Sequence, residues 1–127
     1  MDFTTPHKVG ERIDDDYAQL KPGRGYAHSW VLRNCDGSLA LVATLYEPVS
    51  GRFMEVFTTK PAMHFYAGTY LDGTLVGKNN IRYEKCAGLC LETQGLIDAP
   101  NHPAFPSTIL YPGQIYQSQT IFKFSVK

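Results

Sequence analysis

Short alternating runs, separated by turn signals, follow one another from Tyr26 to the C-terminus of this chain. The runs are rich in β-branched and aromatic residues, which suit a pleated and half-buried surface. They cover residues 28–33, 38–47, 52–59, 62–68, 88–94 and 115–126. Turn-forming residues separate several of them, as in Asn34–Gly37, Pro48–Gly51 and Pro112–Gly113. The pattern therefore predicts an all-β, antiparallel fold, and specifically a β-sandwich.

The apolar spacing also predicts how particular runs are placed. Residues 38–47 are apolar on both faces, which predicts a strand buried between two layers. One of these faces carries Leu39, Leu41, Ala43 and Leu45. Its pairing with residues 52–59 across Pro48–Gly51 predicts an antiparallel hairpin. The last run presents one face from Tyr116 to Val126.

The first 25 residues are the least patterned part of the sequence. Asp14 or Asp15 is placed to cap a helical turn over residues 13–20, which residues 21–25 then break. The acidic run Asp14–Asp16 is expected on a solvated face. With 127 residues the chain is long enough for one core. We expect a single domain over residues 1–127, with residues 1–25 as a lead-in and residues 26–127 as the sandwich strands.

Charge and hydropathy exclude several classes of partner. The 12 basic and 12 acidic residues give a net charge of zero, so we expect no binding of nucleic acid or of an anionic membrane. Apolar runs fall short of the roughly 20 residues that a membrane helix needs. The sequence from Met1 to Asp16 lacks the basic start and apolar run of a signal peptide. A cytoplasmic location is therefore expected.

Cysteines and histidines give no sign of a metal centre. Cys35, Cys86 and Cys90 are odd in number and lack paired C-x-x-C spacing, so we expect three reduced, buried thiols. The four histidines, His7, His28, His64 and His102, lack the spacing of metal ligands. A histidine can still act as an acid or base near neutral pH.

Glu92 is the residue that the strand pattern places best for chemistry. In the run CLETQ, Cys90, Glu92 and Gln94 share one face of the strand. A carboxylate held on a rigid strand can remove a proton from a substrate hydroxyl. From the pattern alone, a solvated surface glutamate is the more common explanation.

Several long segments, taken in order, resemble the C-terminal third of the aldose 1-epimerase (galactose mutarotase) family. The similar segments are residues 23–32, 43–61, 65–78, 89–94, 98–116 and 122–125. The resemblance implies part of a large antiparallel β-sandwich, the galactose mutarotase-like supersandwich, with a sugar site on one sheet face. It implies no cofactor and no metal.

The resemblance assigns roles to three positions. Glu92 matches the catalytic base of the family. Gln94, which shares the strand face of Glu92, is expected to bind substrate beside it. Ala27 stands where the family usually has a sugar-binding Asp, and His64 stands where it usually has a sugar-binding Gln. The family's general-acid His, and its other sugar-binding His and Arg, correspond to no residue of this sequence.

The implied activity is interconversion of the α and β anomers of hexoses such as galactose or glucose, weak or lost in this chain. The alternatives are a non-catalytic carbohydrate-binding module and a self-associating remnant of the enzyme. Part of a sandwich leaves strand edges and an apolar face uncovered, so we also expect a homo-oligomer.

Overall fold

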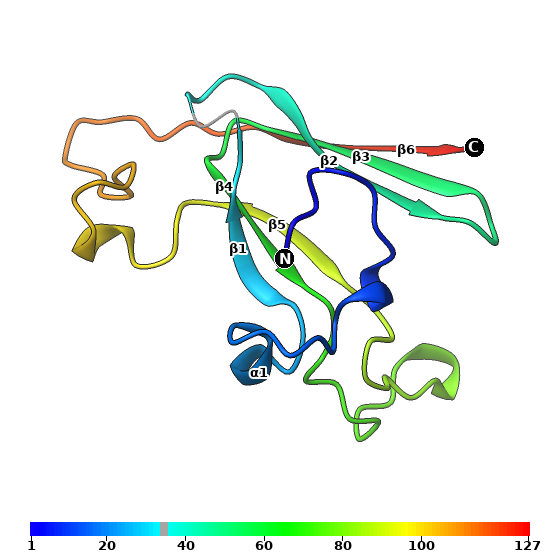
Figure 1. Cartoon of the computed structure of the whole chain (residues 1–127). Coiled ribbons are helices and arrows are strands. Elements are labelled where there is room, and N and C mark those ends of the chain that lie inside the picture. The colour runs from blue at the N-terminus through cyan, green and yellow to red at the C-terminus, as the bar shows by residue number, and fades with distance from the viewer. Residues whose placement is uncertain (34–35) are drawn as a thin grey trace. The chain divides into compact units, whose positions relative to one another are not determined.

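The structure, a computed structural model, describes residues 1–33 and 36–127. The described residues form six strands (Figure 1): β1 (Ala27–Val31), β2 (Ala40–Glu47), β3 (Arg52–Thr58), β4 (Ala62–Tyr66), β5 (Cys90–Gln94) and β6 (Thr120–Val126). Helix is confined to α1 (Leu20–Gly23) and to the 3-10 turns η1 (Val9–Glu11), η2 (Lys78–Asn80) and η3 (Ala99–Asn101). The predicted all-β, antiparallel class is confirmed. Two residues of the turn expected at Asn34–Gly37, Asn34 and Cys35, lie outside the described residues.

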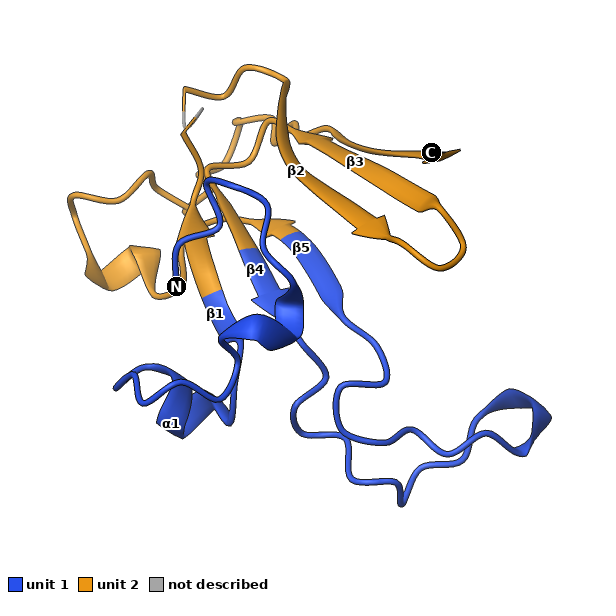
Figure 2. Cartoon of the chain, turned by 45° about the vertical axis from the view of Figure 1, so that its right-hand side comes forward, with its two compact units in different colours: residues 1–28, 64–92 blue, residues 29–63, 93–127 orange. Residues whose placement is uncertain are grey.

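The strands form two three-stranded sheets, in the orders β1-β4-β5 and β2-β3-β6. The chain also divides into two compact units (Figure 2), which are residues 1–28 with 64–92 and residues 29–63 with 93–127. The division falls within β1, β4 and β5. The single domain expected over residues 1–127 therefore stays a prediction.

An aromatic core organises the first unit. Tyr26 is 1% exposed, and its ring stacks on Phe65 at a centroid distance of 5.4 Å. Phe3 meets both rings edge-on, at 5.2 Å from Tyr26 and 5.9 Å from Phe65. Burial raises the pKa of the Tyr26 hydroxyl. The N-terminal segment thus packs against strand residues, with Ile13 and Leu20 also buried.

The second unit contains the predicted hairpin. β2 pairs antiparallel with β3, from Ala40 opposite Thr58 to Glu47 opposite Arg52. β6 pairs antiparallel with the other side of β3, from Thr120 opposite Thr58 to Val126 opposite Arg52. The hairpin expected across Pro48–Gly51 is confirmed.

The predicted faces of β2 are wrong, because the strand carries a bulge. Leu41 lies opposite Phe57, whereas Ala43 lies opposite Val56, so the register shifts between them. An extra residue in a strand reverses the alternation beyond it. Leu41 and Ala43 therefore lie on opposite faces. β2 is also not buried between two layers, since Leu41 is 49% exposed.

Most strand boundaries differ from expectation by one or two residues, and two elements differ by more. The helical turn lies at α1, Leu20–Gly23, and not over residues 13–20. Pro22 is tolerated there because it falls in the first turn, where its missing N–H costs no helical hydrogen bond. Arg24 ends the turn in the left-handed conformation, with φ of 51°. The last strand begins at Thr120, whereas residues 115–119 form no strand.

Candidate functional site

The four candidate residues occupy the three strands of one sheet. Ala27 begins β1, His64 is the middle residue of β4, and Glu92 is the middle residue of β5. These three residues belong to the first unit, whereas Gln94, at the end of β5, belongs to the second. The strand order β1-β4-β5 makes β4 the central strand.

The aromatic core shows which face of the sheet Ala27 and His64 share. Because the rings of Tyr26 and Phe65 stack, these two residues point to the same side of β1 and β4. Successive residues of a strand point to opposite sides. Ala27 follows Tyr26 and His64 precedes Phe65, so both point to the side away from the aromatic core.

Two contacts in the second unit fix the face of β5. The Gln94 Nε2 atom donates to Ser29 Oγ at 3.4 Å, so Gln94 points to the side of Ser29. The Thr93 hydroxyl contacts that of Thr120 at 2.7 Å, so the other side of β5 faces β6. Ser29 alternates with Ala27, and Gln94 alternates with Glu92. In the first unit, Ala27, His64 and Glu92 therefore lie on one face of the sheet.

This shared face is open. Glu92 is exposed, whereas Ala27 and His64 are half-buried. Two depressions formed by the described residues are lined by other side chains. A reacting carboxylate works best in a site from which water is excluded. The arrangement is an exposed carboxylate on a strand, beside two half-buried residues.

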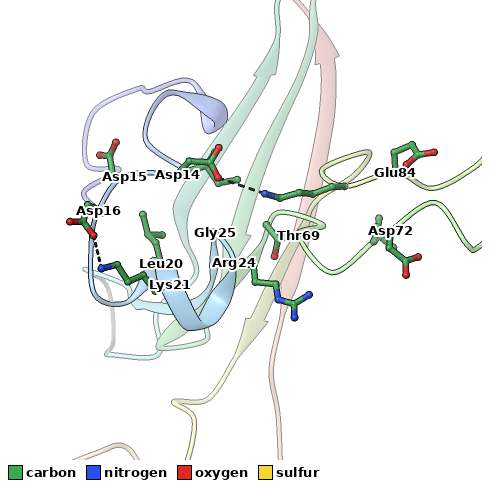
Figure 3. A pocket seen from close by; sticks show the side chains of 13 residues that line it. Asp14, Asp15, Asp16, Leu20, Lys21, Arg24, Gly25, Thr69, Asp72 and Glu84 are labelled. Carbon is green, nitrogen blue, oxygen red and sulfur yellow. Dashed lines mark ion pairs between the residues drawn. The ribbon is translucent and has the colours of Figure 1, made fainter.

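One of the depressions, of about 720 Å³, lies in the first unit and is lined mainly by charged residues (Figure 3). The Lys21 ammonium is 2.6 Å from Asp16, and that of Lys85 is 3.6 Å from Asp14. Both aspartates are more than three-quarters exposed, so the expected solvated face is confirmed for them. Exposed pairs of this kind contribute little to stability.

The other depression, of about 760 Å³, lies in the second unit and includes Thr59, Tyr116 and residues 117–119. The Lys60 ammonium donates to the Tyr116 hydroxyl and lies 4.4 Å from the centre of its ring. This hydrogen bond, with a second one from Ser118, lowers the pKa of Tyr116. The pair is polar and solvated.

The described residues contain no group of three or more His, Cys, Asp or Glu placed to hold a metal ion. Cys86 and Cys90 are free thiols, as expected, but both are exposed, so their predicted burial is wrong. Cys35 lies outside the described residues. Within residues 1–33 and 36–127, no helix has the length and apolar character to cross a membrane.

Two residues of this face were missed by sequence reasoning. Ser29 accepts the hydrogen bond from Gln94, and Tyr66 alternates with His64 on β4. Alternation along residues 62–66 was sufficient to place Tyr66 beside His64. The Ser29 contact joins strands separated by more than 60 residues, so no local pattern predicts it.

Comparisons with known proteins identify the class of protein to which this chain belongs. The family model for aldose 1-epimerase matches residues 1–123. The chain therefore belongs to the aldose 1-epimerase family. The match also includes residues 1–22, which precede the first of the similar segments.

Individual relatives agree with this assignment. Human galactose mutarotase is 41% identical over 126 residues, which are 99% of this chain and 35% of that protein. Aldose 1-epimerase from Escherichia coli is 34% identical over 113 residues, or 87% of this chain and 32% of that protein. A crystal structure of a GalM/aldose epimerase homologue from C. elegans matches 79% of this chain and 30% of its own, with a TM-score of 0.70 and 28% identity. The chain thus spans about a third of the length of these relatives.

Proposed function

We propose that this chain carries the base side of a mutarotase site, with Glu92 as the base, and that it interconverts hexose anomers weakly or not at all. The observation that carries the proposal is the position of Glu92 in a family member. It is exposed on a strand face that also bears Ala27 and His64. Galactose or glucose is the substrate class we propose, and no cofactor enters the reaction.

The chemistry needs two proton transfers. A base takes the proton of the anomeric hydroxyl, and the bond between the anomeric carbon and the ring oxygen breaks. The electrons of that bond pass to the ring oxygen, which takes a proton from an acid, and an open-chain aldehyde results. Rotation about the adjacent carbon–carbon bond and ring closure on the other side give the other anomer. Glu92 supplies the base in this scheme.

The scheme also needs an acid, and no residue of this chain matches the acid of the family. General acid–base groups contribute roughly 10²–10⁴-fold each, so a missing acid leaves a slow reaction. Ala27 has no polar side chain, and the loss of a charge-assisted hydrogen bond there costs about 1.5–3 kcal/mol of sugar affinity. His64 lies on the same face and is our candidate for a replacement donor.

Binding without catalysis is the second candidate function. Tyr66 lies on the face of His64, and its ring stacks on that of Tyr70 at a centroid distance of 6.1 Å. Tyr70 is 53% exposed. Aromatic surfaces beside a few polar groups are typical of small-molecule sites. A self-associating remnant without a ligand is the third candidate.

Polarimetry of α-D-galactose and α-D-glucose tests the catalytic proposal. We expect the wild-type rate to exceed that of buffer by a small factor, and Glu92→Gln to return it to that of buffer. Glu11→Gln, an exposed carboxylate outside this sheet, is the matched control and should keep the wild-type rate. A rate that persists in Glu92→Gln would show that Glu92 is not the base. A wild-type rate within tenfold of a full-length relative would refute the claim of weak activity.

Ala27→Asp separates binding from catalysis. Restoring a carboxylate should tighten galactose binding by about 10- to 100-fold in a calorimetric titration. Wild-type binding without turnover would favour the binding module. If neither wild type nor Ala27→Asp binds sugar or turns it over, the remnant is favoured.

A cytoplasmic location also remains part of the proposal. The exposed free thiols of Cys86 and Cys90 support it, because thiols persist in a reducing compartment. Fractionation of cells that express the chain tests it.

A further inference from the structure

Three threonine hydroxyls are linked in series within the second unit. The hydroxyl of Thr93 on β5 lies 2.7 Å from that of Thr120 on β6, and the Thr120 hydroxyl lies 3.1 Å from that of Thr58 on β3. All three residues belong to the second unit. The side chain of Thr58 is fully buried, whereas Thr93 and Thr120 are half-buried. We call these three residues the threonine network.

The partners of Thr58 fix the direction of every hydrogen bond in the network. A hydroxyl group donates one hydrogen and can accept two. Thr58 donates to the Gln119 carbonyl at 3.1 Å and accepts from the Lys60 N–H at 3.1 Å. Because its only hydrogen is used, Thr120 must donate to Thr58. The hydrogen of Thr120 is then used as well, so Thr93 must donate to Thr120. The bonds therefore run head to tail, from Thr93 to the Gln119 carbonyl.

The network uses hydroxyls at positions that an apolar residue would also suit. Valine has the shape of threonine and fits half-buried and buried positions of a strand. A buried hydroxyl without a partner costs free energy. Hydrogen bonds arranged head to tail polarise and strengthen one another. The loss of one hydroxyl should therefore weaken the bonds that the other two make.

The network also supplies the shortest side-chain hydrogen bond of β5. In the described part of the chain, the side chains of β5 make two hydrogen bonds, one from Thr93 and one from Gln94. The bond from Gln94 to Ser29 is 3.4 Å long, beyond the usual range, whereas that from Thr93 is 2.7 Å. Glu92 is exposed, and the described residues give its carboxylate no hydrogen bond or ion pair. The position of Glu92 therefore depends on the strand that carries it.

Thr93 is placed to hold this part of the strand. It lies between Glu92 and Gln94 and points to the opposite side of β5. A hydrogen bond on that side fixes the backbone from which both neighbouring side chains project. The effect reaches Glu92 through one peptide bond of the same strand. Misplacing a reacting group by about 1 Å can lower a rate by about 100-fold, so this support has a consequence for catalysis.

We propose that the threonine network fixes β5, and that Thr93 is a positioning residue for Glu92 and Gln94. The proposal rests on the proposed function, in which Glu92 is the base. Thr93 does not touch the sugar. Its hydroxyl, held by Thr120 and through it by Thr58, keeps the two polar side chains in place while the sugar binds and reacts.

Amide hydrogen exchange, measured residue by residue by NMR, tests the positioning without reference to catalysis. Thr93→Val keeps the shape and removes the hydroxyl. We expect the protected amides of β5 to exchange about 10-fold faster in this variant. Amides of residues 44–47, at the end of the β2–β3 hairpin away from Thr58, should change by less than about twofold. Thr93→Ser keeps the hydroxyl, and its β5 amides should stay within about threefold of wild type.

Thr44→Val is the matched control for the loss of a threonine hydroxyl. Thr44 is an exposed residue of β2 outside the network, so its substitution should leave the exchange of β5 unchanged. Circular dichroism checks that each variant is folded. If Thr93→Val is not folded, Thr120→Val takes its place, because it removes the acceptor of the same hydrogen bond.

The double variant Thr58→Val/Thr93→Val tests whether the three hydroxyls act as one network. Thr58 and Thr93 are linked through Thr120, so each substitution breaks the same series of bonds. Together they should accelerate the exchange of β5 by less than the product of their separate effects. Effects that multiply would show two independent bonds and would overturn the network.

Polarimetry of galactose then connects the network to the reaction. Where wild type shows turnover, Thr93→Val should lower kcat by about 10-fold and change KM by less than that, and Thr93→Ser should restore kcat. A wild type without turnover refutes the proposed function, and the exchange measurement then decides the positioning role alone. The proposal is overturned if β5 exchanges at the wild-type rate in folded Thr93→Val. Equal acceleration in all strands, or acceleration in Thr93→Ser as large as in Thr93→Val, also overturns it.

Discussion

β4 and β6 have the same kind of sequence and opposite burial. In both strands large apolar residues occupy alternate positions, which are Met63 and Phe65 in β4 and Phe122, Phe124 and Val126 in β6. In β4, Met63 is 5% and Phe65 8% exposed, whereas in β6 Phe122 is 45% and Phe124 73% exposed. Alternation specifies a strand with one apolar face, but it does not specify what covers that face.

The neighbours of the two strands account for the difference. β4 is the central strand of its sheet, and the ring of Phe3 from the N-terminal segment packs against Phe65. β6 is an edge strand, and the residues that precede it are exposed. β6 therefore has the composition of a core strand, although nearly all of its side chains are exposed.

Truncating one aromatic residue in each strand is the strongest test of this comparison. Phe65→Ala should lower the free energy of unfolding by about 3–5 kcal/mol, since it leaves a cavity beside Tyr26 and Phe3. Phe124→Ala should change it by less than about 1 kcal/mol, because this side chain is already in water. Urea denaturation measures both. Equal losses of stability in the two variants would show that the apolar face of β6 is covered as well as that of β4.

Thr58 marks the end of β3 at which the β2-β3-β6 sheet is well covered. Its side chain is buried, and its hydroxyl donates to the Gln119 carbonyl and accepts from the Lys60 N–H. Thr58→Val keeps the shape but leaves both groups without this partner, and it should cost about 1–3 kcal/mol. Thermal unfolding measures the loss.

Thr44→Val is the matched control for this change. Thr44 lies on the neighbouring strand β2 but is exposed, so its substitution should be near neutral. A loss of stability at Thr44 as large as that at Thr58 would show that burial of Thr58 and its hydrogen bonds does not explain the effect.

The strands were predictable because their signals are local. Alternation and turn residues placed the hairpin of β2 and β3 correctly. The bulge after Leu41 was not predictable, since a register shift is decided by pairing with Phe57 and Val56 rather than by β2 itself. The exposure of β6 was not predictable for a similar reason. The same alternating apolar pattern occurs in strands of a core and in strands at an interface.

The candidate site was predictable in part. Alternation placed Gln94 on the side of Glu92, and the resemblance to the family selected Glu92 from among the acidic residues. The shared face of Ala27 and His64 needed the ring contact between Tyr26 and Phe65, which joins residues 39 positions apart. Contacts between distant segments are the information that a one-dimensional pattern lacks.

Glu47, the last residue of β2, gives the smallest expected effect. Its carboxylate accepts hydrogen bonds from the N–H groups of Val49 and Ser50 and from the Ser50 hydroxyl. These bonds lower the pKa of Glu47 from its ordinary value of 4.5, and the bond from the Ser50 hydroxyl contributes most to that shift. Folding therefore favours the ionised form. The resulting stability is present above that value and is lost as the pH falls through the lower, folded-state pKa.

Glu47→Gln should thus lower the urea midpoint slightly at neutral pH, and the difference from wild type should shrink as the pH falls below the ordinary value of 4.5. Glu84→Gln, a carboxylate in the other unit, controls for the general effect of removing a charge. A difference that persists undiminished in acid would mean that the hairpin is stabilised by the shape of the side chain at position 47.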